Sequence, residues 1–196
     1  MIVLIIVFGG AFNPPTKAHE AIYHTLKQRF NPERIVLLPV GDVYHKADLA
    51  PCVHRVAMLQ RLFEHESICD IATIECESTV FSGTYHTLKN LKERYEQEMV
   101  YVIGADHLEG LKHWLHAEEL IRSTRFVVLN RHQKPLAQMI DEDTWLKRHK
   151  HQFLLVEDVD FPMAATNYRD HRAHGVVPEV IETYIKKHRL YLKEAH

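Results

Sequence analysis

The chain alternates between short apolar runs and longer segments with helical periodicity. The short runs are continuously apolar and rich in branched side chains, which is typical of parallel strands covered on both faces. We expect strands at Ile2–Phe8, Arg34–Pro39, Cys69–Ile74, Met99–Ile103, Arg125–Leu129 and Gln152–Val156. We expect helices at Thr16–Arg29, Val53–Glu64, Thr84–Tyr95, His107–Lys112 with Ala117–Ile121, Leu136–His149, Thr166–Ala173, and after Pro178, which suits a first helical turn.

This order of elements predicts an α/β fold. Strands that alternate with helices form a Rossmann-like, doubly wound parallel sheet with right-handed crossovers, and here C-terminal helices complete it. No linker, repeat or low-complexity stretch interrupts the pattern, so we expect residues 1–196 to form a single domain. Ligands of such sheets bind at the carboxyl ends of the strands. We therefore expect the chemistry in the loops that follow Phe8, Pro39, Ile103 and Leu129.

Composition narrows the class of protein. The 196 residues are 46% hydrophobic and 26% charged, a balance typical of soluble globular proteins. Lys and Arg number 24 against 26 Asp and Glu, so no basic excess indicates a nucleic-acid partner. The apolar opening is too short to span a bilayer and lacks a basic leader, so we expect no membrane partner and a cytoplasmic location.

Cysteine and histidine usage bears on the cell compartment and on metal binding. Cys52, Cys69 and Cys76 are scattered and form no C-x-x-C pair, so we expect reduced, buried thiols in a reducing compartment. The 16 histidines raise a metal-binding alternative. No H-E-x-x-H or zinc-finger spacing occurs, and the pair His171 and His174 has no third ligand nearby in sequence. We therefore expect no metal site built from protein side chains.

The loop after the first strand carries the strongest chemical signal. Residues 8–19 read F-G-G-A-F-N-P-P-T-K-A-H and open the first helix. Gly9 and Gly10 allow the backbone to approach a ligand, and a helix N-terminus offers N–H groups to an anion. Thr16 and His19 are three residues apart, so both can point at one phosphate. A structural strand-to-helix turn with a threonine cap is the competing interpretation.

This loop resembles the signature of the nucleotidyltransferase superfamily, His-or-Thr-x-Gly-His after a glycine-rich turn. Within the superfamily it is most similar to the bacterial nicotinate-nucleotide adenylyltransferase family, which has a Gly-Gly-x-Phe-(Asp/Asn)-Pro-Pro opening. The similarity extends over nearly the whole chain. It implies the nucleotidyltransferase type of Rossmann-like fold. It also implies an ATP site formed by Gly9, Gly10, Ala11, Phe12, Thr16, His19, Gly104, Asp106, Arg131, Thr166, Asn167 and Arg169.

The same resemblance implies an acceptor site. His45-Lys46 and the stretch 54–59, H-R-V-A-M-L, are similar to the family's His-Lys and His-Arg-x-x-Met-Leu segments, in which the lysine contacts phosphate. Ser82-Gly83-Thr84 resembles a Ser-Tyr-Thr whose threonine contacts the acceptor. Gly104-Ala105-Asp106 with Trp114 resembles a segment whose aspartate binds ribose and whose tryptophan stacks on the pyridine ring. The acceptor residues are thus Lys46, Thr84 and Trp114, with a solvated lysine, a helix N-cap and a core tryptophan as the respective alternatives.

The roles in catalysis follow from the resemblance. The stretch 163–169, M-A-A-T-N-Y-R, aligns with a second helix N-terminus that holds the outer phosphates of ATP. We expect His19 and Thr16 to donate to the α-phosphate, Lys46 to draw the two anionic reactants together, and Arg169 to stabilise the departing pyrophosphate. Mg²⁺ is expected with the ATP phosphates rather than in a protein cage.

These implications predict adenylyl transfer from ATP to nicotinate mononucleotide, giving deamido-NAD and pyrophosphate in NAD biosynthesis. Nicotinamide mononucleotide or phosphopantetheine is an alternative acceptor. A second alternative is a weakened, non-catalytic nucleotide-binding protein, suggested by Ala18, Ala164 and Ala165, which stand where the family has glycine or serine. Assembly into an oligomer is possible.

Overall fold

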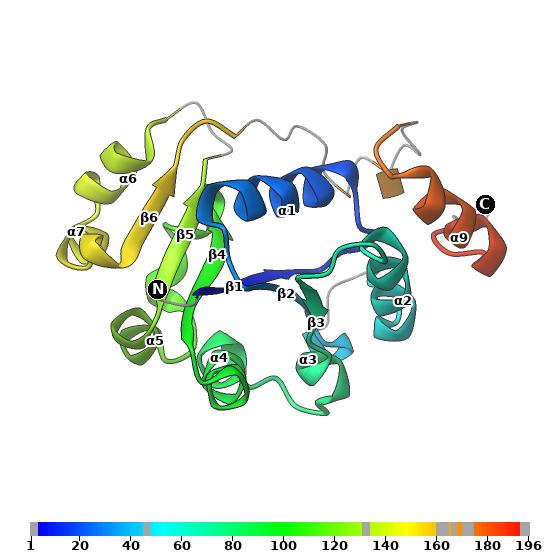
Figure 1. Cartoon of the computed structure of the whole chain (residues 1–196). Coiled ribbons are helices and arrows are strands. Elements are labelled where there is room, and N and C mark those ends of the chain that lie inside the picture. Colours follow the sequence, from blue (N-terminus) through cyan, green and yellow to red (C-terminus); the bar gives the residue numbers. More distant parts are fainter. Residues whose placement is uncertain are drawn as a thin grey trace.

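The structure is a computed structural model that describes residues 4–44, 48–130, 134–159, 165, 168–169 and 175–192. Six parallel strands form one sheet in the order β3-β2-β1-β4-β5-β6 (Figure 1). The strands are β1 (Leu4–Gly10), β2 (Arg34–Pro39), β3 (Cys69–Ile71), β4 (Glu98–Gly104), β5 (Arg125–Leu129) and β6 (Phe153–Val156). This order confirms the predicted doubly wound, Rossmann-like sheet, because the chain moves outward from β1 in both directions.

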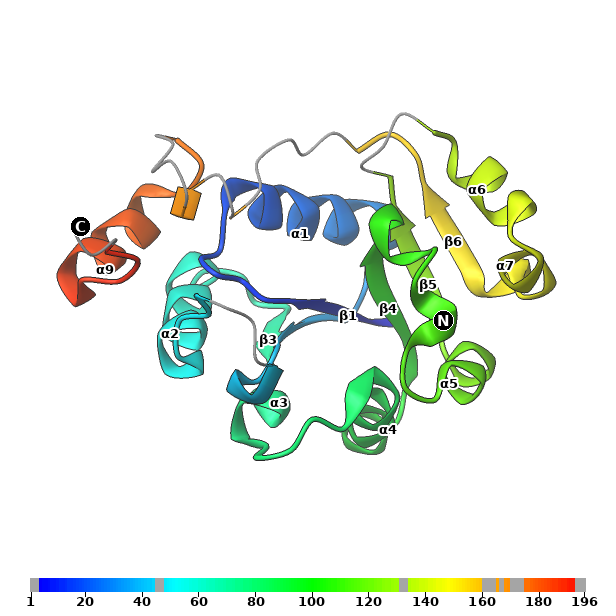
Figure 2. The same ribbon diagram turned by 180° about the vertical axis from the view of Figure 1, so that it is seen from behind.

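Helices cover both faces of the sheet. They are α1 (Lys17–Phe30), α2 (Cys52–Leu62), α3 (Ile74–Glu77), α4 (Gly83–Tyr95), α5 (Ala117–Ser123), α6 (Leu136–Glu142), α7 (Thr144–Arg148) and α9 (Glu179–His188). Single 3₁₀ turns occupy Asp42–Tyr44, Ala105–His107, Leu111–His113 and Lys150–Gln152. Figure 1 shows α1 on one face of the sheet and α4 and α5 on the other. Figure 2 shows α2 and α9 together at the end of the molecule opposite α6 and α7.

Burial on both faces explains the continuous apolar runs. In β1, Ile5 and Val7 pack into the core that includes α4 and α5, whereas Ile6 and Phe8 pack into the core that includes α1 and α2. All four side chains are buried, so neither face of this strand tolerates polar residues. The apolar runs thus located every strand to within a few residues.

Three predicted elements differ from the structure. The third strand ends at Ile71, and the residues beyond it turn into the short helix α3 instead of extending the strand. The helix expected over 107–112 is replaced by two 3₁₀ turns. The helix expected over 136–149 breaks at Asp143, whose carboxylate accepts hydrogen bonds from the N–H groups of Trp145 and Leu146 and so caps a new helix, α7. The helix expected at 166–173 falls almost entirely outside the described residues.

The expectation of reduced thiols is wrong for one pair. Cys52 and Cys76 form a disulfide, with Cα atoms 5.7 Å apart. Cys52 opens α2 and Cys76 lies in α3, and the neighbouring strands β2 and β3 bring these two helices together across 24 residues of sequence. Cys69 is a free cysteine, and burial raises the pKa of its thiol to about 12. The cysteines therefore give no support for a reducing compartment.

In the part of the chain that the structure describes, no helix is long and apolar enough to cross a membrane.

Candidate active site

A cavity of about 500 Å³ opens at the carboxyl ends of the strands. Its walls include the residues at or after the ends of β1, β2, β4 and β5, as the sheet topology predicts. It brings together eight of the predicted site residues, which come from four separate parts of the chain: Gly9, Gly10, Ala11, His19, Thr84, Gly104, Asp106 and Trp114. The loop after β1, residues 8–19, which we call the phosphate loop, therefore faces the same cavity as Thr84 and Trp114, the two expected acceptor residues that the structure describes.

His19 is held in a defined orientation at the start of α1. The backbone N–H of Thr16 donates to Nδ1 of His19 at 3.0 Å, as in a capping box. The Thr16 hydroxyl lies 2.8 Å from the same nitrogen. A backbone N–H can only donate, so Nδ1 carries a lone pair and the proton of the neutral ring is on Nε2. The imidazole lines the cavity, which makes it a candidate donor to a bound phosphate.

Thr16 does not have the position expected of a direct phosphate ligand. Its side chain is fully buried (0% exposed) and is not among the described residues that line the cavity. The hydroxyl is directed to the imidazole of His19 instead. Spacing along the helix correctly placed the two residues on one face, but it did not reveal that they contact each other.

Gly9 and Gly10 were expected to let the backbone approach a ligand. In the structure, protein side chains also lie close to both glycines. A Cβ on Gly9 would lie 2.2 Å from the hydroxyl oxygen of Tyr101, and a Cβ on Gly10 would lie 3.3 Å from the ring of Phe12. Phe12 itself is buried and packs edge to face on Phe8, so it supports the loop from within the core and does not line the cavity. The Tyr101 side chain therefore excludes a Cβ at Gly9, whereas a Cβ at Gly10 would require only a small shift of Phe12.

The residues after β4 form the opposite wall. Asp106 lies in the 3₁₀ turn that follows Gly104, and its carboxylate is 3.8 Å from Nε2 of His107. The ring of His107 meets that of Trp114 edge to face, with centroids 5.8 Å apart. Trp114 is half-buried, packs against the core and also lines the cavity. Trp114 therefore belongs to the packed core and to the cavity wall at once, and its stacking on a pyridine ring stays a prediction.

The start of α4 forms the expected acceptor wall. Thr84 lines the cavity and makes a side-chain hydrogen bond with Tyr101. Gly83 has a φ of +79°, and a Cβ there would lie 3.0 Å from the Cβ of Leu115. This backbone conformation and this contact favour glycine. The departure from the family's tyrosine at this position is thus accommodated by the local packing.

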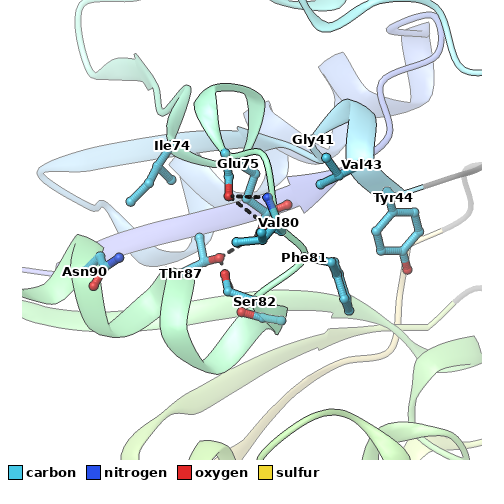
Figure 3. Close-up of a pocket in the computed structure, with 12 residues that line it drawn as sticks. Gly41, Val43, Tyr44, Ile74, Glu75, Val80, Phe81, Ser82, Thr87 and Asn90 are labelled. Carbon is cyan, nitrogen blue, oxygen red and sulfur yellow. Dashed lines mark hydrogen bonds between the residues drawn. The ribbon is translucent and has the colours of Figure 1, made fainter.

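Sequence reasoning missed a half-buried carboxyl group beside the acceptor wall. Glu75 lines the main cavity and also a side pocket of about 80 Å³ (Figure 3). The Thr87 hydroxyl donates to its Oε1 at 3.0 Å, and Gly41 provides a backbone N–H. Burial raises the pKa of this carboxyl, while both hydrogen bonds oppose that rise. Glu75 follows β3 at the same sheet edge as the other site residues, but the loop after the third strand was not among those in which we expected the chemistry.

Arg169 lies against the first loop rather than in the cavity wall. Its Nη1 donates to the carbonyl oxygen of Asn13 at 2.5 Å. Asn13 is buried (3% exposed), and its Oδ1 accepts from the Tyr191 hydroxyl at 2.8 Å and from the Ala50 N–H at 3.0 Å. Its Nδ2 donates to the Asp48 carbonyl at 2.8 Å. Asn13 therefore joins the phosphate loop to two other segments of the chain.

Four predicted site residues, Lys46, Arg131, Thr166 and Asn167, lie outside the described residues. Ala164, one of the substituted positions, also lies outside them. Ala18 is buried in α1 and is not among the described residues that line the cavity, so its methyl group is accommodated in the core. Within the described ranges, no group of three or more His, Cys, Asp or Glu side chains is arranged to hold a metal ion.

Comparison with known structures supports the fold. The nicotinic acid mononucleotide adenylyltransferase of Plasmodium falciparum, solved in complex with NaAD, superimposes with a TM-score of 0.76 at 20% identity, over 96% of this chain and 97% of that one. A structure titled a putative nicotinate-nucleotide adenylyltransferase from Vibrio parahaemolyticus gives a TM-score of 0.66 at 16% identity, over 97% and 96% of the two chains. At these identities the likeness concerns the fold.

Comparison of sequences supports the family. The cytidylyltransferase-like family model matches residues 7–181. A probable nicotinate-nucleotide adenylyltransferase of Acholeplasma laidlawii is 36% identical over 151 residues, 76% of this chain and 79% of that protein. One from Listeria innocua is 30% identical over 193 residues, 96% of this chain and 97% of that protein. The chain therefore belongs to the cytidylyltransferase-like family and, within it, to the nicotinate-nucleotide adenylyltransferases.

Proposed function

We propose that the chain transfers the adenylyl group of ATP to nicotinate mononucleotide, with release of pyrophosphate. The orientation of His19 is the observation that carries this proposal. Its Nδ1 accepts from the Thr16 N–H, so its Nε2 is the nitrogen that can donate to an α-phosphate oxygen. Gly9, Gly10 and Ala11 line the same cavity, as do Thr84 and Trp114 on the acceptor wall.

The chemical step is an in-line displacement at phosphorus. An oxygen of the acceptor phosphate attacks the α-phosphorus of ATP, and the bond from that phosphorus to the bridging β-phosphate oxygen breaks. Pyrophosphate leaves with the electron pair. A phosphate monoester has a second pKa near 6, so the nucleophile is mostly dianionic at neutral pH and requires no general base. The residues of the chain then contribute by positioning the reactants and by stabilising charge.

Each wall of the cavity has a proposed role. His19 donates to the α-phosphate, and Thr16 orients that imidazole instead of contacting ATP. Asp106 accepts hydrogen bonds from the ribose of ATP, and Trp114 stacks on the pyridine ring of the acceptor. Mg²⁺ enters as part of the substrate, on the phosphates of ATP. The roles of Lys46, Arg131, Thr166 and Asn167 stay predictions from the family resemblance.

The decisive assay measures pyrophosphate release from Mg-ATP with a panel of acceptors. We expect turnover with nicotinate mononucleotide to exceed that with nicotinamide mononucleotide or phosphopantetheine. Faster turnover with either of the other two would reassign the acceptor. Saturable ATP binding without pyrophosphate release from any of them would instead establish a non-catalytic nucleotide-binding protein.

His19→Ala tests the proposed donor directly. Loss of one donor aimed at developing charge typically lowers kcat by about 10²–10³-fold. We expect that loss here, with the melting temperature close to that of the wild type. His24→Ala is the matched control, because His24 lies on the exposed side of the same helix. Wild-type kcat in purified His19→Ala would refute the role of this residue.

A further inference from the structure

A buried arginine behind the cavity joins two of its walls. Arg55 lies on α2 and is fully buried (0% exposed). Its Nε donates to the carbonyl oxygen of Ala50 at 2.7 Å, and its Nη1 donates to the carbonyl oxygen of Ala11 at 3.1 Å. Its Nη2 donates to Oδ1 of Asp42 at 2.8 Å. All three nitrogens of the guanidinium group are thus used by protein partners.

Each partner belongs to a segment that reaches the cavity. Ala11 lines the cavity and directly follows the two glycines of the phosphate loop. Asp42 begins the 3₁₀ turn Asp42–Tyr44, and Tyr44 lines the cavity from the other side. Ala50 lies near the end of the same connection, just before α2. Arg55 therefore links the phosphate loop to both ends of the connection between β2 and α2.

The surroundings fix this arginine before any ligand arrives. Burial of a charged group is costly unless hydrogen bonds compensate for lost water, and the three acceptors provide that compensation. Asp42 is held by α2 as well, because its Oδ2 accepts from the N–H of Cys52 at 3.1 Å. A guanidinium presents its donors in one rigid plane, so the positions of its acceptors are defined relative to one another.

We propose that Arg55 is a positioning residue for adenylyl transfer, and that it sets the separation between the phosphate loop and the turn Asp42–Tyr44. This inference rests on the function proposed above. Arg55 is not among the described residues that line the cavity; it acts through Ala11 and Asp42. Its loss should therefore disturb the alignment of the two reacting phosphates more than the affinity for ATP.

Arg55→Lys is the first variant, because lysine keeps the charge but cannot donate to three acceptors in one plane. A misplacement of about 1 Å can lower a rate about 100-fold. We expect kcat per folded molecule to fall about 100-fold, while the dissociation constant for ATP, measured by calorimetry, changes less than about 3-fold. Arg61→Lys is the control, because Arg61 lies on the exposed side of the same helix and donates to Ala57.

Hydrogen exchange provides a readout that does not require turnover. Arg55→Lys should raise amide exchange in both segments 8–13 and 40–50, and Arg61→Lys should leave both unchanged. Asp42→Asn should also lower kcat. The fold-decrease in kcat of the double variant should be smaller than the product of the two single fold-decreases, because Arg55 and Asp42 act through one contact. If Arg55→Lys does not fold, kcat and hydrogen exchange are measured on Asp42→Asn instead, and these two results test the positioning role.

Failure of the proposed function and failure of the positioning role of Arg55 give different results. A wild-type protein without pyrophosphate release contradicts the proposed function, whatever Arg55 does. A variant with lowered melting temperature but wild-type kcat per folded molecule and wild-type exchange in both segments overturns the positioning role. The same holds if Asp42→Asn, as the remaining folded variant, matches the wild type in both readouts.

Discussion

At the scale of single residues, the pairing of Thr16 with His19 changes how the signature motif is understood. The motif suggested two donors to one phosphate, yet the Thr16 hydroxyl lies 2.8 Å from Nδ1 of His19. The hydroxyl therefore adds to the backbone N–H that already defines the tautomer. The spacing of Thr16 and His19 predicted that the two side chains lie on one face. It did not determine whether the Thr16 hydroxyl would contact a phosphate or the imidazole of His19.

Thr16→Val tests this orienting role. Valine has nearly the shape of threonine and removes only the hydroxyl, and one hydrogen bond is typically worth about 0.5–1.5 kcal/mol. We expect kcat to fall about 3- to 10-fold, far less than in His19→Ala. Thr16→Ser, which retains the hydroxyl, should stay close to the wild type. Thr25→Val removes a hydroxyl from the same helix, where it donates to Ala21, and should not affect kcat. Equal losses in the valine and serine variants would contradict the assignment.

At the scale of elements, apolar runs and turn residues predicted the sheet, and the carboxyl-end rule predicted the site. Gly104, Asp106 and Trp114 reached the cavity as expected, because a strand end fixes where the following residues begin. Glu75 was missed because the predicted third strand ended directly before it, yet the loop after that strand was not among the loops expected to carry chemistry. The break at Asp143 was missed because an aspartate within a helical pattern can either face solvent or cap a new helix.

The contact between β1 and β4 at Gly9 leads to a prediction at this scale. In Gly9→Ala the new Cβ would lie 2.2 Å from the Tyr101 hydroxyl oxygen, which nothing but a shift of backbone or ring can relieve. Overpacking of this kind typically costs about 1–3 kcal/mol, so we expect a lower melting temperature.

Two further variants make that prediction specific. Adding Tyr101→Phe removes the hydroxyl and should restore part of the lost stability; the ring carbon that bears it would still lie 2.9 Å from the new Cβ. Gly110→Ala is the matched control, because the nearest atom to a Cβ there is 3.9 Å away. Equal melting temperatures for Gly9→Ala and Gly110→Ala would show that the loop relaxes without cost.

At the scale of the whole molecule, α9 returns the end of the described chain to α2, the helix that carries Arg55. Its buried face packs Ile181 and Ile185 against Met58. At the edge of this contact, Nδ1 of His54 lies 3.0 Å from the Tyr184 hydroxyl, and the ring of His188 stacks on that of Tyr184 at 4.1 Å. No local sequence pattern predicts this cluster, because His54 lies 130 residues before Tyr184 along the chain.

We expect this cluster to make the docking of α9 sensitive to pH. Desolvation lowers the pKa of His188, and the nearby His54, Lys187 and Arg61 lower it further. The folded state thus favours the neutral ring, while the unfolded chain takes up the proton at higher pH. The stabilisation is present above the unfolded pKa of about 6.5 and is lost as pH falls through the lower folded-state value.

His188→Gln isolates this effect, since glutamine keeps a polar side chain that does not titrate in this range. Between pH 7.5 and 5 we expect the melting temperature of the wild type to fall by more than that of His188→Gln. Because the charge of His54 is coupled to that of His188, the difference between the two falls in melting temperature reports the cluster of His54, Tyr184 and His188. His151→Gln, at an exposed position in the turn before β6, should follow the wild type. If the melting temperatures of the wild type and His188→Gln fell equally between pH 7.5 and 5, the charge on His188 would have no effect on the docking of α9.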